Sequence, residues 1–175
     1  MCGSETPESI LTASDLESAL RRLQSPDWMV REQAAHDLGE LTDERATSAL
    51  LGALNDADDS VRESAAMALG PIEGPPDACV TERLLELLAR EEFGHVREAA
   101  AGALYHVADA GSIARLGQAL SDESLSVRHS LVFALWRIGL PECLPYLREA
   151  LDDEEENIRK DAREAIDSIS DSMHS

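Results

Sequence analysis

The chain has 175 residues, a length that suits one domain, and 35 acidic against 15 basic residues give it a formal net charge of −20. No apolar run reaches the roughly 18 residues that a membrane span needs, and no basic start precedes an apolar stretch as in a secretory signal. We therefore expect a cytoplasmic protein without membrane insertion. Nucleic acid is also disfavoured as a partner, because phosphate binding requires clustered Lys and Arg.

Five similar units follow one another along the chain, between expected flexible ends at residues 1–13 and 171–175. Each unit has a short apolar stretch, then an acidic turn, then a longer Ala- and Leu-rich stretch. The short stretches read LESALRRL, TSALLGAL, TERLLELL, IARLGQAL and LPYLREAL. The longer ones open with the pairs Val30-Arg31, Val61-Arg62, Val96-Arg97, Val127-Arg128 and Ile158-Arg159.

Steps of 31, 35, 31 and 31 residues separate these pairs. Leu and Ala recur at three- and four-residue steps within each stretch, which is the period of a helix. A fixed period of this size predicts stacked units. We therefore expect an all-α solenoid of about five helix-turn-helix repeats, forming one domain over residues 14–170.

The longest step contains the segment 70–77, with two Gly and three Pro in eight residues. Such a segment cannot continue a helix, so we expect an enlarged loop between the second and third repeats. Simple insertion, a hinge and a contact loop are the three interpretations of this loop.

The repeats resemble the HEAT family, in particular its short subtype of about 30 residues found in phycobilin-lyase subunits. The matching pattern is Asp-x-x-Val-Arg followed by Ala-Ala and Leu-Gly, as in Asp27 to Gly39 and Asp58 to Gly70. Phe93 replaces the Asp in the third repeat, and Arg163 interrupts Ala-Ala in the fifth. The resemblance covers about residues 14 to 170 and implies the fold rather than an activity.

The five arginines that follow Val or Ile form a repeated set, which we call the arginine ladder: Arg31, Arg62, Arg97, Arg128 and Arg159. One interpretation is a row of anion-binding groups. The other is structural, because an arginine at the same place in every unit can bridge to acidic turn residues of its neighbour. We expect the structural role.

The basic residues are almost all arginine, with Lys160 as the single lysine. An acid excess with so little lysine resembles proteins of haloarchaea that accumulate salt, in which repulsion is screened over about 3 Å at 1 M salt. The alternative is an acidic surface that meets a basic partner.

The sequence offers no catalytic residue, metal site or cofactor site. Cys2, Cys79 and Cys143 are too far apart for a disulfide framework or a zinc cluster. No His-Glu pair is present, unlike in the HEAT-type iron enzyme deoxyhypusine hydroxylase. His95 and His129 could approach each other at the starts of adjacent helices, but without a carboxylate partner a surface role is the simpler interpretation.

Helical phase predicts one candidate binding face. At about 100° per residue, offsets +2, +6 and +9 from each Val or Ile lie opposite the core arc. These offsets carry a set of large side chains in the middle repeats: Met67, Tyr105, His129, Phe133 and Trp136. Gly102 leaves room between them for a partner side chain. The alternative is that the aromatic rings cap the core.

We interpret the chain as a non-enzymatic adaptor that binds another protein through this face, which lines the concave side in HEAT-type solenoids. The resemblance to short acidic HEAT-type proteins of haloarchaeal taxis gene clusters implies Che signalling proteins or the archaellum as partners. The alternative is a bilin-lyase-like or other enzyme accessory subunit.

Overall fold

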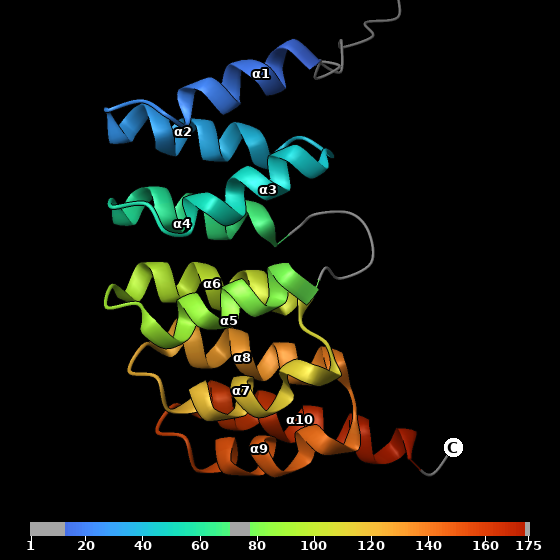
Figure 1. Ribbon diagram of the computed structural model, residues 1–175. Coiled ribbons are helices and arrows are strands. Elements are labelled where there is room, and N and C mark those ends of the chain that lie inside the picture. Colours follow the sequence, from blue (N-terminus) through green and yellow to red (C-terminus); the bar gives the residue numbers. More distant parts are fainter. Residues whose placement is uncertain (1–12, 71–77, 174–175) are drawn as a thin grey trace, which may run out of the picture.

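The computed structural model describes residues 13–70 and 78–173, and these residues form ten α-helices and no strands. The helices pair into five units that stack in chain order (Figure 1). The prediction of an all-α solenoid is confirmed. The first helices of the units are α1 (Ala13–Arg22), α3 (Glu44–Ala53), α5 (Ala78–Arg90), α7 (Ile113–Gln118) and α9 (Leu144–Glu149). The second helices are α2 (Trp28–Gly39), α4 (Asp59–Leu69), α6 (Gly94–Val107), α8 (Leu125–Ile138) and α10 (Glu156–Ser172).

Short 3-10 helices extend the first helices of the last two repeats, at Ala110–Ser112, Ala119–Ser121, Pro141–Cys143 and Ala150–Asp152. Helix α1 begins at Ala13, one residue inside the expected N-terminal segment, and α10 runs to Ser172, inside the expected C-terminal one. The other residues of the N-terminal segment, residues 174–175 and residues 71–77 of the expected loop lie outside the described residues.

Side-chain caps start most of the second helices. Asp27, Asp58 and Ser124 each accept a hydrogen bond from a backbone N–H in the first turn of α2, α4 or α8. Phe93, which departs from the repeat pattern, makes no such bond. The carboxylate of Glu91 accepts hydrogen bonds from the backbone N–H groups of Glu92 and Phe93 instead. The side chain of Glu91 therefore stabilises this turn.

The core lies between the two layers of helices and runs the length of the stack. Its largest fully buried side chains are aliphatic: Leu38, Leu50, Leu54, Leu69, Leu84, Leu87, Leu104, Leu116, Leu131, Leu135, Leu147 and Ile158. All six aromatic side chains are at least partly exposed. Leucine from both layers and alanine from the second helices therefore supply the burial that stabilises the fold.

Successive second helices approach each other closely because small residues face each other. A Cβ atom on Gly39 would lie 2.7 Å from the Cβ of Ala68, and one on Gly70 would lie 2.9 Å from the Cα of Ala103. These helices thus form a continuous layer, and we call its solvent side the B face: the exposed side of α2, α4, α6, α8 and α10. A Cβ on Gly102, in α6, would meet nothing within 4 Å.

We expect opposite effects when Gly70 and Gly102 are each replaced by alanine. Gly70→Ala should destabilise the protein by about 1–3 kcal/mol, because the new methyl group forces α4 away from the backbone of α6. Gly102→Ala should stabilise it by about 0.5–1 kcal/mol through helix propensity alone. Chemical denaturation of both variants and the parent measures this, and a Gly70→Ala protein as stable as the parent would show that the two helices are free to separate.

Candidate functional site: the B face and the arginine ladder

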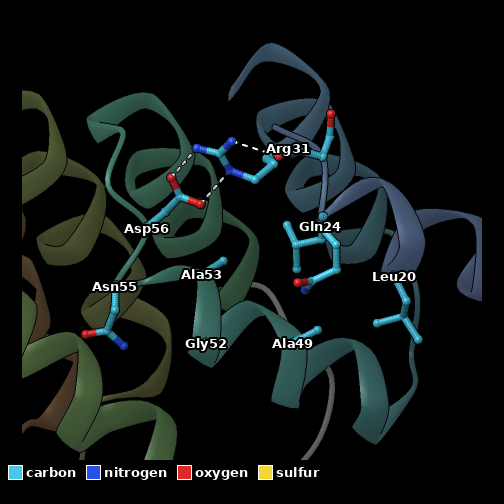
Figure 2. Close-up of a pocket in the computed structure, with 10 residues that line it drawn as sticks. Leu20, Gln24, Arg31, Ala49, Gly52, Ala53, Asn55 and Asp56 are labelled. Atoms are coloured by element: carbon cyan, nitrogen blue, oxygen red, sulfur yellow. Dashed lines mark hydrogen bonds and ion pairs between the residues drawn. The ribbon is translucent and has the colours of Figure 1, made fainter. Parts of the chain in front are cut away.

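Each arginine of the ladder except the last bridges to the acidic turn of the following repeat. Arg31 makes two hydrogen bonds to Asp56 with Nε and Nη2, both 2.7 Å (Figure 2). Three further pairs repeat this arrangement at 2.8–3.2 Å: Arg62 with Glu91, Arg97 with Asp122, and Arg128 with Asp153. Bidentate contacts of this kind fix the relative orientation of the two side chains as well as pairing their charges.

The same acidic residues also contact the arginine of their own repeat. The backbone oxygen of Asp56 accepts a hydrogen bond from Nη1 of Arg62 at 2.9 Å, while its carboxylate binds Arg31. Asp122 is held in the same way between Arg97 and Arg128. Glu91 and Asp153 repeat this arrangement. Each of the four carboxylate residues therefore lies between two successive arginines, six residues before the second of them, and the ladder connects all five repeats.

The two ends of the ladder differ from its middle. Ser25 occupies the position that is acidic in the other repeats, and its backbone oxygen accepts a hydrogen bond from Arg31 at 2.9 Å. Arg159 donates to the backbone oxygens of Asp153 and Glu154 at 2.7 and 2.8 Å. Among the described residues, no carboxylate lies within ion-pair distance of Arg159.

The contacts of Asp56 and Glu91 favour the ionised form of their carboxyl groups. The hydrogen bond from Arg31 holds the pKa of Asp56 below its usual value, although burial acts in the opposite direction. The hydrogen bond from Arg62 lowers the pKa of Glu91 in the same way. Because the arginine and the carboxylate of each pair already neutralise each other within the stack, we infer a structural role for the ladder rather than the binding of a free anion.

The expected binding residues lie on the B face with different exposures. Met67 is 60% exposed and Tyr105 is 36% exposed, whereas His129, Phe133 and Trp136 are half-buried. The last three form one cluster on α8. The ring centroids of His129 and Phe133 are 4.8 Å apart, and those of Phe133 and Trp136 are 5.7 Å apart. The aromatic part of the face is therefore concentrated on a single helix.

Trp136 is less exposed than helical phase predicts, because it packs partly against the core. Its offset, +9, is also that of Gly39 and Gly70, and these glycines contact the next second helix. In these repeats the +9 position lies at the seam between neighbouring second helices, where the ring of Trp136 is partly covered, whereas Tyr105 at the same offset in the third repeat is 36% exposed. An ideal helical wheel ignores this neighbour.

The two histidines do not form the pair considered from the sequence. His95 Nε2 lies 3.0 Å from Asp59 on α4, and His129 Nε2 lies 3.0 Å from Asp161 on α10. Each therefore bridges two second helices across the B face. The part of the chain that the structure describes contains no group of three or more potential metal ligands.

Two of the hollows along the stack bear on binding. One has a volume of about 510 Å³ and lies on the B face between α4 and α6, with Gly70, Ala99 and Gly102 in its lining. The other, of about 580 Å³, lies between α1 and α3, and its rim is the Arg31–Asp56 pair (Figure 2). In the second hollow, the charges of Arg31 and Asp56 already neutralise each other and are not available to a ligand. Sequence spacing alone did not reveal either hollow, although Gly102 signalled the open space in the first.

Two further expectations concern cysteines and membranes. Cys143 is fully buried, and burial raises the pKa of its thiol. Cys79 is exposed, neither Cys79 nor Cys143 is in a disulfide, and Cys2 lies outside the described residues. Over residues 13–70 and 78–173, no helix combines the length and the apolar character required to cross a bilayer.

The net charge of −20 predicts a strong salt response. We expect full helical structure at molar KCl and cooperative loss of it in dilute buffer, because unscreened carboxylates repel one another along the stack. Circular dichroism across a KCl series measures this, with NaCl as a control for ion identity. A helical signal and melting temperature that stay constant down to low salt would contradict adaptation to salt.

Comparison with known proteins supports the repeat architecture. A family model described as HEAT repeats matches residues 13–105 and 81–167. The complex of CpcE and CpcF of phycocyanin lyase from Nostoc sp. PCC7120 is similar with a TM-score of 0.76 and 24% identity, over 98% of this chain and 70% of that one. No curated protein sequence matches the chain.

Two other solved structures share the architecture at lower identity. A designed armadillo repeat protein in complex with the peptide (KR)4 has a TM-score of 0.71 and 19% identity, over 88% of this chain and 81% of that one. The Cnd3–Cnd2 subcomplex of S. pombe condensin has a TM-score of 0.73 and 21% identity, over 92% of this chain and 23% of that one. At these identities the likeness is one of fold.

Proposed function

Because this chain belongs to the HEAT-repeat family, we propose that it is a non-enzymatic adaptor whose B face binds a partner protein. The repeat solenoid is an architecture typical of protein-interaction scaffolds, since stacked repeats present an extended surface. The designed armadillo protein of the same architecture is seen in complex with a peptide.

The observation that carries this proposal is the grouping of large side chains on one face. Met67 is exposed on α4, Tyr105 is exposed on α6, and the ring cluster is on α8. These three helices follow one another in the layer of second helices (Figure 1). Exposed apolar groups that cluster, rather than occur singly, mark interaction sites, and aromatic residues and methionine are enriched in them. Half-buried rings that are already held in place lose little entropy on binding.

The test is partner capture by wild-type and variant proteins at molar KCl. Immobilised Phe133→Ala and Trp136→Ala proteins should recover much less of the proteins captured by the wild type from an extract of the source organism. Trp28→Ala is the matched control, because Trp28 is 41% exposed at the start of α2, away from the ring cluster. Equal capture by all four proteins, measured by quantitative mass spectrometry, would refute binding through the B face.

A narrower proposal names the partners as Che signalling proteins or components of the archaellum. Its support is the acidic composition and the short repeat type, which resemble the accessory proteins of haloarchaeal taxis clusters. Reciprocal co-purification with a tagged Che protein at high salt tests it. Absence of taxis proteins from a specific, Phe133-dependent set of captured proteins would remove this proposal and leave the adaptor role.

The competing proposal is an accessory subunit of a lyase-like enzyme. It is supported by the likeness to the phycocyanin lyase complex, which at 24% identity is a likeness of fold. Mixing the purified protein with a free bilin separates the two proposals: a shifted visible absorption band that follows the protein through gel filtration favours the accessory subunit.

A further inference from the structure

The hollow between α4 and α6 has an open floor that packing does not explain. Gly39 and Gly70 are small because the next second helix lies against them, but a Cβ on Gly102 would meet nothing within 4 Å. Glycine inside a helix costs about 1 kcal/mol relative to alanine. At the same offset in the neighbouring repeats stand Met67 and Phe133, so Gly102 leaves a gap between two large side chains.

The hollow is also negatively charged. Glu63 and Glu98 are in its lining, which contains no Lys or Arg. Glu98 accepts a hydrogen bond from the hydroxyl of Ser124 at 2.7 Å, and Glu63 has no ion pair or side-chain hydrogen bond among the described residues. His95, which is also in the lining, already bridges to Asp59. An apolar floor between two carboxylates suits a side chain with an aliphatic stem and a cationic head, which is lysine or arginine.

The ring cluster is on α8, and α8 is the second helix that follows α6 in the stack (Figure 1). Packed helices are 8–10 Å apart, and an extended peptide advances about 3.3 Å per residue. A residue about three positions from the cationic one would therefore reach Phe133 and Trp136, where an apolar side chain fits.

We propose that the hollow at Gly102 binds one lysine or arginine of an extended partner segment, whose apolar residue about three positions away covers the rings of Phe133 and Trp136. This inference rests on the proposed function and names the chemistry of the partner. Charge complementarity selects a cationic segment, and the position of the rings sets the spacing.

Three ten-residue peptides in a Gly/Ser background test the proposal by NMR titration, at the lowest KCl concentration that keeps the protein fully helical. One carries Arg and Leu three positions apart, the second replaces Arg by Glu, and the third replaces Leu by Ser. The Arg/Leu peptide should shift the amide signals of Ala99 and Gly102, and both other peptides should bind about tenfold more weakly or worse. Equal binding of the Arg and Glu peptides would overturn the proposal.

Gly102→Leu and Gly52→Leu form the matched pair of variants. Both glycines lie inside helices with nothing within 4 Å of an added Cβ, but Gly52 is in the lining of the hollow between α1 and α3 (Figure 2). Both variants should melt no earlier than the wild type, since leucine favours helix. Gly102→Leu should weaken binding of the Arg/Leu peptide about tenfold or more, and Gly52→Leu should leave it unchanged.

Wild-type affinity in Gly102→Leu would overturn the inference about the hollow. The proposed function fails differently: it is refuted when Phe133→Ala and Trp136→Ala capture partners as well as the wild type. Capture that depends on Phe133 but survives Gly102→Leu therefore keeps the adaptor role and removes only the cationic site.

Discussion

Arg128→Ala is expected to lower the free energy of unfolding by about 3–5 kcal/mol, because it leaves the carboxylate of Asp153 buried without its cation. The two side chains of this pair are only 7% and 9% exposed. The backbone oxygens of Asp122 and Glu123 would lose their donor as well. Urea denaturation at fixed high salt measures the change, and a loss below 1 kcal/mol would mean that the turn does not depend on the pair.

Arg159→Ala is the matched control for this prediction. Arg159 makes the same two bonds to backbone oxygens of its own turn but lacks a carboxylate partner among the described residues. Its replacement should therefore cost only a small fraction of the loss in Arg128→Ala. A double-mutant cycle of Arg128→Ala and Asp153→Ala isolates the contribution of the pair, because Asp153→Ala removes the stranded charge.

Leu135→Ala is expected to destabilise the protein by about 2–5 kcal/mol through lost burial and the cavity that remains. Leu135 is fully buried on α8, beside the ring cluster. In a chain of this size such a change lowers the melting temperature by roughly 4 to 20 °C. Differential scanning calorimetry at molar KCl measures it.

Phe133→Ala and Trp136→Ala are the comparison on the same helix. Phe133→Ala should leave the melting temperature almost unchanged, and Trp136→Ala should lower it by less than Leu135→Ala, because Trp136 packs only partly against the core. A Trp136→Ala protein that melts as early as Leu135→Ala would show that this ring belongs to the core.

The fold followed from the sequence because each repeat buries the same kinds of side chain at the same spacing. The pairs from Val30-Arg31 to Ile158-Arg159 mark the second helices, and a two-layer stack is what buries their Val, Ala and Leu. The helix bounds could be predicted less well at Ala13 and Ser172, because frayed and continuing helix ends have similar composition.

The details of the B face depended on contacts between repeats, which helical phase does not include. Phase placed Met67 and Tyr105 among the exposed residues, but it overestimated the exposure of Phe133 and Trp136, which are half-buried. The bridges from His95 to Asp59 and from His129 to Asp161 join residues about one repeat apart. Sequence spacing can suggest such pairs only after the stacking of the repeats is known.

The contacts of the arginine ladder give the stack a polarity. At the end formed by α9 and α10, Arg159 is already held by its own turn in the orientation that its equivalents use to bind the next carboxylate. At the other end, Ser25 supplies a backbone oxygen but no carboxylate. A repeat of the same type fused after α10 would find its ionic partner in place. In a repeat fused before α1, the ladder arginine would face the hydroxyl of Ser25 instead of a carboxylate. Ser25→Asp is the substitution that would supply the missing carboxylate.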